Sequence, residues 1–203
     1  MFEKFKNFNI SKEQYTKIND VQSIIIFLII FAVLYSNFLF AYVPSASMYP
    51  TLAVKEFGIA RKGNIENLEF QDIVLFHPEE GTKEIYVKRL IGLPGDTIEI
   101  KEGKLIRNGE TVEEDYTLDD VMVGDVEEFT VPDNHYFMMG DNRNHSYDCR
   151  FIGSIPEDLM VGEMVFHMRV FPDKELEMIE YSKKVSAINE EMADFQWAEP
   201  TNK

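Results

Sequence analysis

Three polar segments of the sequence combine reactive side chains with residues that restrict the backbone. The first runs from Pro44 to Leu52 and carries hydroxyls at Ser45 and Ser47. Its two prolines restrict the backbone, and the small residues between them leave a hydroxyl exposed. A serine hydroxyl becomes a nucleophile when an adjacent base takes its proton. Taken alone, the segment is equally compatible with a stiff linker.

The second segment, residues 86–96, offers a candidate base. If it begins as a strand, Tyr86, Lys88 and Leu90 share one face, which puts the amine between two large apolar side chains. A free lysine has a pKa of about 10.4, and burial among apolar groups lowers that pKa by several units. The opposite face is also largely apolar, so the pattern alone leaves open whether Lys88 is buried or solvated.

The third segment, residues 140–153, is dense in polar groups and lies between two apolar runs. It contains His145, Ser146 and Asp148, the residue types of a catalytic triad. Triads are recognised by geometry, but residues this close on one short segment rarely converge on a single hydroxyl. The segment is therefore interpreted as a hydrogen-bonded loop or as a supporting part of a site.

Metal chemistry finds no support in the sequence. The histidines outside these segments, His77, His135 and His167, are scattered and lack the spacing of metal ligands. The residue three positions after Ser47 is Pro50, so the Ser-x-x-Lys pattern of penicillin-binding proteins is absent. We expect neither a metal nor an organic cofactor.

An uncharged stretch precedes the three segments. No charged residue occurs between Val21 and Val54, and Ile24 to Val43 has the roughly 20 residues that a helix needs to cross a membrane. A buried core helix usually carries a polar stripe, and the apolar region of a cleaved signal peptide is normally about 7–15 residues long. We therefore predict a transmembrane anchor with Tyr42 at the interface.

Charges on either side of the stretch predict its orientation. Four lysines precede it, whereas the next basic residue after it is Lys55. The positive-inside rule then places the N-terminus in the cytoplasm and the chain after Val43 outside. The single cysteine, Cys149, suits an extracytoplasmic domain that does not rely on disulfides.

The chain after the anchor reads as short strands separated by turns. The clearest hairpin turns at Glu102 and Gly103. No helical pattern alternates with the strands, so we predict a mostly β fold of antiparallel sheets. The expected strands are residues 72–76, 84–91, 97–101, 104–107, 128–131, 135–139 and 163–171.

Two further segments lie outside this pattern. Residues 113–128 hold eight acids and no base, which is typical of a solvated loop or insertion. After Pro172, apolar residues recur at alternating spacings of three and four, which predicts an acidic, amphipathic C-terminal helix over residues 173–203. Such a helix packs back on its own domain or contacts a partner.

Composition narrows the possible functions. The 203 residues are 45% hydrophobic and 28% charged, as in globular proteins. Lys and Arg number 20 against 36 Asp and Glu, and the net charge of −16 argues against a nucleic-acid partner, which requires a basic face. One cysteine excludes a disulfide-stapled scaffold and a zinc ribbon.

Together and in this order, the segments resemble bacterial type I signal peptidase, a membrane-bound serine protease with a Ser–Lys dyad. A single anchor with a compact domain is similar to its short Gram-positive-type form. The resemblance reaches about Pro172 and implies a catalytic domain of antiparallel sheets. The matching motifs are Pro-Ser-x-Ser-Met-x-Pro-Thr-Leu from Pro44, Lys-Arg-x-Ile-Gly-Leu-Pro-Gly-Asp from Lys88 and Gly-Asp-Asn-Arg-x-x-Ser-x-Asp-x-Arg from Gly140.

The resemblance implies roles for residues of the first two segments. Ser47 matches the nucleophile and Lys88 the general base. The Ser47 backbone N–H and the Ser45 hydroxyl match the donors that stabilise the oxyanion. Met48 is a candidate for lining a shallow pocket that accepts a small substrate residue.

The third segment matches the supporting residues of the family site. Ser146 matches the residue that orients the lysine, and Asp148 with Arg150 matches a charge pair that holds the site together. Two departures concern only local hydrogen bonding and sensitivity to thiol reagents. Asn144-His145 stands where Asp-Asn is more usual, and Cys149 stands where a serine is often found.

The resemblance implies an endopeptidase of the bacterial cell membrane that cleaves signal peptides after small residues of the Ala-x-Ala type. Its partners would be exported preproteins and the lipid bilayer. The expected domains are a cytoplasmic segment (1–20), an anchor (21–43), a peptidase domain (44–172) and a tail (173–203), whose deletion from 175 onward should spare the chemistry.

Two alternatives remain at this point. Self-cleaving repressor-type proteases also use a Ser–Lys dyad, but they are soluble and carry a DNA-binding part. A catalytically inactive homologue would instead bind preproteins or act as a secretion-complex scaffold. The presence of Ser47, Lys88, Ser146 and Asp148 favours the enzyme.

Overall fold

The computed structural model describes residues 12–118 and 121–169, with side chains from Asp20 onward. The chain divides into two compact units, Met1–Phe38 and Leu39–Lys203, and each is described by itself. The predicted helix over residues 173–203 lies outside the described residues.

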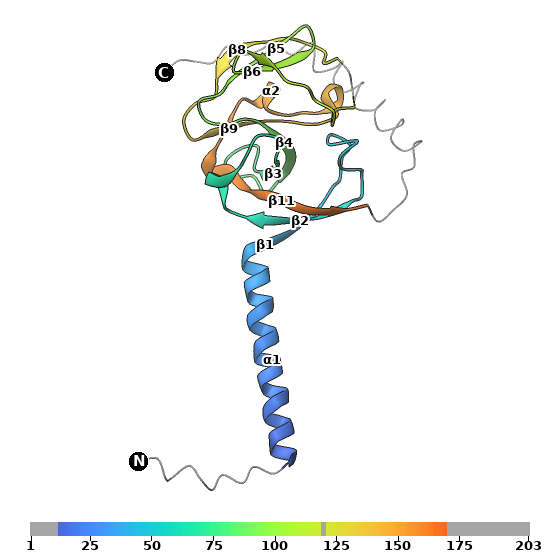
Figure 1. Ribbon diagram of the computed structural model, residues 1–203, viewed down its shortest axis with the longest axis vertical. Helices are drawn as coiled ribbons and strands as arrows, with labels where there is room; N and C mark the ends of the chain where they lie inside the picture. Colours follow the sequence, from blue (N-terminus) through green and yellow to red (C-terminus); the bar gives the residue numbers. More distant parts are fainter. Residues whose placement is uncertain (1–11, 119–120, 170–203) are drawn as a thin grey trace. The chain divides into compact units, whose positions relative to one another are not determined.

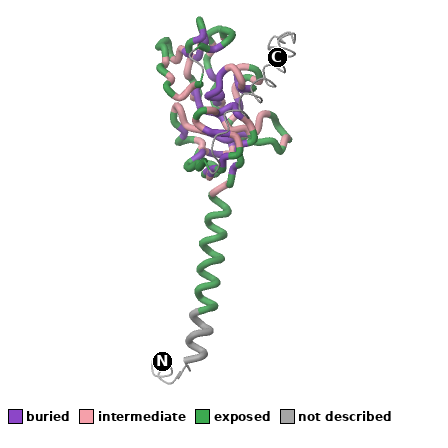
Figure 2. The backbone as a smooth tube through the Cα atoms, turned by 90° about the vertical axis from the view of Figure 1, so that its right-hand side faces the viewer, coloured by how far each residue is buried: buried purple, intermediate pink, exposed green. Residues whose placement is uncertain are grey.

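The first unit contains a single long helix, α1, Lys12–Asn37 (Figure 1). Its part from Asp20 to Asn37 is long and apolar enough to cross a membrane, and all of these residues are exposed (Figure 2). The helix begins earlier than the predicted anchor and ends at Asn37 instead of Val43.

Local hydrogen bonds and strand propensity account for the earlier end of α1. The side chains of Ser36 and Asn37 both donate to the Val33 carbonyl, at 3.0 and 2.8 Å, and such bonds compete with the regular helical pattern. The next residues are rich in aromatic side chains, which favour strands. They form β1, Phe38–Tyr42.

The second unit is built on a seven-stranded sheet in the order β1-β2-β11-β3-β4-β9-β10. Adjacent strands from β2 through β10 pair antiparallel. β4, which carries Lys88, pairs with β3 and β9 near the middle of this order. The bounds are β2 Phe57–Lys62, β3 Ile73–Phe76, β4 Tyr86–Gly92, β9 His135–Met139, β10 Ile155–Pro156 and β11 Met160–Met168.

A second, four-stranded sheet has the order β7-β6-β5-β8. The predicted hairpin forms its centre, and both turn residues, Glu102 and Gly103, have positive φ. Short helices complete the unit. The bounds are β5 Thr97–Lys101, β6 Lys104–Arg107, β7 Glu110–Thr111, β8 Val126–Thr130, α2 Cys149–Ile152 and the 3-10 turns η2 Ile65–Asn67, η3 Arg143–His145 and η4 Glu157–Leu159.

The mostly β, antiparallel fold predicted from the sequence is confirmed. Each of the seven predicted strands overlaps an observed one. β1, β2, β7 and β10 were not predicted. β1 continues the uncharged run of the predicted anchor, β2 contains a glycine and two charged residues, and β7 and β10 have only two residues each.

Two hydrophobic clusters hold the second unit together. The larger cluster joins the two sheets through residues such as Leu90, Ile98 and Phe137. The smaller lies beneath the Pro44–Leu52 segment and includes Met48, Leu52 and Leu75. Burying one such side chain stabilises the fold by roughly 1.5–3 kcal/mol. Both β4 and the Pro44–Leu52 segment are therefore anchored in the hydrophobic core.

Candidate active site

Ser47 and Lys88 lie in direct contact, although 41 positions separate them in the sequence. The Lys88 ammonium donates to the Ser47 hydroxyl at 2.6 Å. Lys88 lies on β4 and Ser47 in the turn between Pro44 and Leu52. Both residues are buried, with exposed fractions of 5% and 8%.

Burial changes the chemistry of the Lys88 amine. Removal from water disfavours the ammonium form and lowers its pKa from 10.5 to about 8, although the nearby carboxylate of Asp148 acts in the opposite direction. The amine also donates to the Val87 carbonyl at 3.2 Å and lies 5.5 Å from the centre of the Tyr86 ring. A larger fraction of Lys88 is therefore neutral, and able to accept a proton, near physiological pH than of an exposed lysine.

A second hydroxyl lies beside the first. The Ser45 and Ser47 Oγ atoms are 3.2 Å apart, and Ser45 is partly exposed. A hydroxyl at this distance can donate to an oxygen that develops negative charge near Ser47. Met48, in contrast, is 1% exposed and packs in the smaller core cluster, so it presents almost no surface to a substrate.

The third sequence segment supports the backbone of the first. The Asn142 N–H donates to the Ser47 carbonyl at 3.1 Å, and its side-chain amide donates to the Ala46 carbonyl at 3.2 Å. Gly140 makes this close approach possible. A Cβ at that position would lie within 3.0 Å of the Ser47 carbonyl oxygen and of the Ser146 side chain.

Asp148 and Arg150 form the ion pair that the resemblance implies. The Arg150 Nε and Nη2 atoms lie 2.8 and 2.9 Å from the two Asp148 oxygens. Burial alone would raise the pKa of Asp148, but the Arg150 guanidinium and the Gly140 N–H outweigh it, so the pKa is lowered. Arg150 also donates to the Arg143 carbonyl at 2.6 Å, which fixes the loop against α2.

Ser146 is close to the dyad, but it does not bond to Lys88. Its hydroxyl is buried and makes no hydrogen bond of normal geometry within the described residues, although it lies near enough to help lower the pKa of Asp148. The orienting role implied for Ser146 stays a prediction. His145 lies beside Asn142, with Nδ1 3.2 Å from Oδ1, and the Ser146 hydroxyl makes no hydrogen bond to His145 within the described residues.

A second buried ion pair, to which the sequence analysis assigned no role, lies beside the dyad. Arg89 donates to both oxygens of Asp141, at 2.8 and 2.6 Å, and Asp141 is fully buried. The Thr51 hydroxyl donates to the same carboxylate, and Arg89 also donates to the Gln71 carbonyl at 2.8 Å. The sequence signal that could have predicted this pair is that Arg89 directly follows Lys88 and Asp141 directly follows Gly140, each inside a motif.

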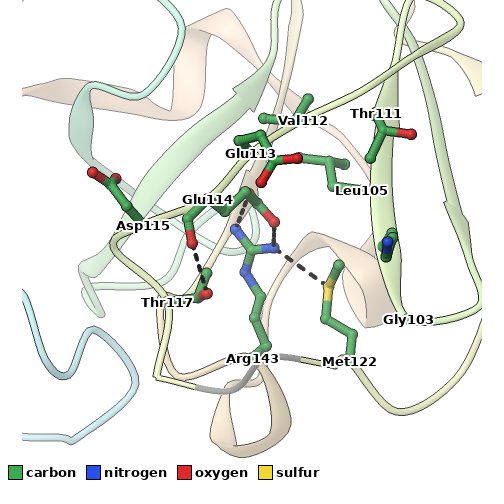
Figure 3. A pocket seen from close by; sticks show the side chains of 11 residues that line it. Gly103, Leu105, Thr111, Val112, Glu113, Glu114, Asp115, Thr117, Met122 and Arg143 are labelled. Carbon is green, nitrogen blue, oxygen red and sulfur yellow. Dashed lines mark hydrogen bonds and ion pairs between the residues drawn. The ribbon is translucent and has the colours of Figure 1, made fainter.

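Residues 113–128 were predicted to form a solvated loop or insertion, and this is wrong for Glu114. Its carboxylate accepts two hydrogen bonds from the buried guanidinium of Arg143, at 2.5 and 2.6 Å (Figure 3). The Glu114 side chain is only 9% exposed. The pair forms one wall of a cavity of about 310 Å³ that is also lined by Lys104, Glu113 and other residues.

No group of three metal-ligating side chains comes together in residues 12–118 and 121–169. The assembled residues are instead a hydroxyl, an amine of lowered pKa, a second hydroxyl and two buried ion pairs. This arrangement can take the proton of a serine hydroxyl as it attacks a carbonyl, hold a developing oxyanion and return a proton to a leaving group.

Comparison with known proteins assigns the chain to a family. The family model described as "Signal peptidase, peptidase S26" matches residues 18–169. Signal peptidase I T of Bacillus subtilis (strain 168) is 38% identical over 178 residues, which cover 79% of this chain and 92% of that protein. Signal peptidase I S of the same strain is 38% identical over 159 residues, or 71% and 84% of the two chains.

Other relatives are longer or overlap less. Signal peptidase I of Leptolyngbya laminosa is 37% identical over 135 residues, which cover 61% of this chain and 65% of that protein, so the match spans just under two thirds of the relative. A solved signal peptidase I structure from Enterococcus faecalis V583 is 31% identical and has a TM-score of 0.42, covering 48% of this chain and 96% of that one. From the extent of the family match and the Bacillus relatives, we conclude that the chain belongs to the signal peptidase family, peptidase S26.

Proposed function

We propose that this protein is a membrane-bound serine endopeptidase that removes signal peptides from exported preproteins. The observation that carries the proposal is the 2.6 Å hydrogen bond between a buried Lys88 amine and the Ser47 hydroxyl. Burial of a lysine with only a structural role destabilises the fold, because the ammonium loses its hydration. A general base, in contrast, needs the lowered pKa that burial produces.

The proposed reaction has two halves. The neutral Lys88 amine takes the proton of Ser47, whose oxygen attacks the scissile carbonyl and forms a tetrahedral intermediate. The lysine ammonium then gives that proton to the leaving amine as the C–N bond breaks. In the second half the same amine takes a proton from water, which attacks the acyl-enzyme ester, and the proton returns to Ser47.

The oxyanion of each intermediate needs donors. We assign these to the Ser47 backbone N–H and the Ser45 hydroxyl, supported by the 3.2 Å separation of the two hydroxyls. Asp148 and Arg150 are assigned the role of fixing the loop around the dyad. Preference for small residues before the cleaved bond follows from the family alone.

Two observations support attachment to a membrane. The first is α1, whose Asp20–Asn37 part has the length and composition of a span. The second is an exposed apolar face on β1, β2 and β11. Met168 pairs with Phe57, whose ring lies 5.4 Å from that of Tyr42. Phe40, Phe166 and Met168 are more than half exposed, and Tyr42 and Phe57 are about half exposed. Such a face suits contact with lipid. We propose that the N-terminus is cytoplasmic, from the lysines that precede the span.

The test is cleavage of a preprotein whose signal ends in Ala-x-Ala, by the full-length protein in detergent micelles. Wild type, Ser47→Ala and Lys88→Ala are compared, and mass spectrometry locates the cut. We expect wild type alone to cleave after the second alanine. A folded wild-type protein that binds the preprotein without cutting it would instead identify an inactive preprotein-binding homologue.

A further inference from the structure

The acidic segment, defined here as residues 113–118, packs against the loop that supports the dyad. We propose that Glu114 is a positioning residue for the cleavage reaction: acting through Arg143, it fixes the Gly140 carbonyl and thereby the backbone of Ser47. The inference rests on the proposed function and adds a residue that lies outside the three sequence motifs.

Arg143 is the link between the acidic segment and the site. Its side chain is 1% exposed, and the Glu114 carboxylate accepts from both Nη1 and Nη2. Its remaining nitrogen, Nε, donates to the Gly140 carbonyl at 3.0 Å. Figure 3 shows the guanidinium between Glu114 and Met122, whose sulfur lies 3.4 Å from Nη1. One planar group therefore joins the segment to Gly140.

Gly140 passes this constraint to the dyad. Its N–H donates to Asp148 at 2.9 Å, and its Cα faces the Ser47 carbonyl so closely that no side chain fits. Two residues later, Asn142 bonds to the carbonyls of Ser47 and Ala46. A shift of Gly140 would therefore displace the backbone that presents the Ser47 hydroxyl and N–H.

Other contacts of the segment act on the same loop. The Leu118 N–H donates to the Asp141 carbonyl at 3.1 Å. The ring of Tyr116 lies 3.9 Å from the Arg89 guanidinium and 5.9 Å from that of Arg143, and its hydroxyl donates to Glu114 at 2.7 Å. The segment thus contacts the guanidinium groups of both Arg89 and Arg143, and Glu114 supplies the negative charge that pairs with Arg143.

Loss of the Glu114 charge leaves the Arg143 cation buried with weaker partners. The two oxygens of a carboxylate accept a bidentate pair of hydrogen bonds from a guanidinium, whereas the side-chain amide of glutamine has only one acceptor oxygen. The Nε–Gly140 bond then loses its fixed geometry. A misplacement of reacting groups by about 1 Å lowers turnover by as much as roughly 100-fold.

The experiment compares wild type, Glu114→Gln and Arg107→Gln as full-length proteins in detergent, with the Ala-x-Ala preprotein as substrate. Arg107 is the matched control, because it also pairs with a carboxylate, that of Asp96, and lies 4.3 Å from an aromatic ring, that of Phe70. Arg107 lies on β6 of the four-stranded sheet, and Asp96 directly precedes β5. Unfolding midpoints are measured alongside kcat and KM at two temperatures well below each midpoint.

We expect kcat of Glu114→Gln to fall by roughly 10- to 100-fold, with KM within about twofold of wild type and the same ratio at both temperatures. Arg107→Gln should lower the midpoint and leave kcat unchanged. Unchanged kcat in Glu114→Gln, or a loss that follows the unfolded fraction, would overturn the inference. If wild type itself does not cleave, the proposed function fails instead.

A milder variant keeps the test decisive where Glu114→Gln does not fold. Tyr116→Phe removes one hydrogen bond to Glu114 and keeps the ring and the ion pair. We expect a fall in kcat of about fivefold, the equivalent of one ordinary hydrogen bond. A wild-type kcat in folded Tyr116→Phe contradicts the positioning role.

Discussion

Lys88 and Arg89 are consecutive residues of β4, and each holds a different part of the same two loops. Lys88 bonds to Ser47, and Arg89 bonds to Thr51 at the other end of that turn and to Asp141 of the supporting loop. Both side chains are buried. Two adjacent basic residues of β4 thus hold the Pro44–Leu52 segment against the loop that carries the Asp148–Arg150 ion pair.

The first prediction concerns the pH dependence of cleavage. A base must be neutral to accept a proton, so activity requires the deprotonated form of Lys88, whose pKa is lowered by burial to about 8. We expect kcat/KM to rise about tenfold per pH unit below pH 7 and to level off above about pH 8.5. Asp148, with its lowered pKa, stays ionised throughout this range. Initial rates between pH 6 and 9.5 test this, and a flat profile would exclude Lys88 as the base.

The second prediction concerns the free energy of unfolding of Lys88→Met, a variant that lacks the proposed general base. Below pH 8 the folded protein holds a buried ammonium, whereas between 8 and 10.5 only the unfolded chain keeps that proton, so wild-type stability rises with pH in this window. The difference between 10.5 and about 8, at roughly 1.4 kcal/mol per pH unit, gives about 3 kcal/mol.

Lys88→Met removes this penalty and loses the Ser47 hydrogen bond, which contributes about 1 kcal/mol. We expect the variant to be inactive, and its free energy of unfolding at pH 7 to exceed that of wild type by about 2 kcal/mol, with no gain above pH 10.5. Thermal unfolding in detergent at both pH values measures this. A variant less stable than wild type at pH 7 would show that Lys88 is structural.

The third prediction separates the Arg89–Asp141 pair from surface pairs. Arg89→Met leaves a fully buried carboxylate without its guanidinium, and breaking a buried pair costs about 3–5 kcal/mol. We expect a correspondingly large drop in the unfolding midpoint, partly restored by adding Asp141→Leu. Arg61→Met is the control, because its pair with Glu163 is 46% and 22% exposed and contributes at most about 1 kcal/mol. Equal effects of the two single changes would refute the assignment.

Much of the fold follows from local patterns in the sequence. Alternation and turn residues predict the central strands and the hairpin at Glu102-Gly103, which the structure confirms. β1 could not be separated from the anchor, because its apolar residues continue the uncharged run and only pairing with β2 makes them a strand. Strands of two residues, such as β7, are defined by their partners alone.

The site shows the same division. Ser47 and Lys88 stand in segments whose wording resembles a known family, so their contact could be expected. Glu114 and Arg143 are 29 positions apart, and no spacing rule pairs them. Charge alone predicts that an acidic stretch is solvated. A buried guanidinium on another loop, however, needs a carboxylate partner, because an unpaired buried charge is strongly destabilising.

The fourth prediction concerns the cysteine that replaces a more usual serine. Cys149 is 2% exposed, and burial raises the pKa of its thiol, so little thiolate forms and reagents have no access. We expect native protein treated with iodoacetamide at pH 8 to keep full activity and to remain unlabelled by mass spectrometry. Guanidinium-unfolded protein should take up one label. Inactivation of wild type, but not of Cys149→Ala, would show that the thiol is accessible beside the dyad.

The last prediction tests the closeness of the two loops at Gly140. An added methyl group would meet the Ser47 carbonyl oxygen and the Ser146 side chain within 3.0 Å, and the first of these is backbone that cannot rotate away. Gly58→Ala is the matched control, because its closest contacts are the sulfur and terminal carbon of the flexible Met164 side chain.

Overpacking a core costs about 1–3 kcal/mol, so both variants should lose some stability. Only Gly140→Ala should also lose kcat, by roughly 100-fold, because its clash moves the nucleophile. Cleavage assays on both variants below their unfolding midpoints decide the matter. Equal kcat values would mean that the supporting loop yields to the methyl group without disturbing Ser47, and that the backbone contact is not what positions the dyad.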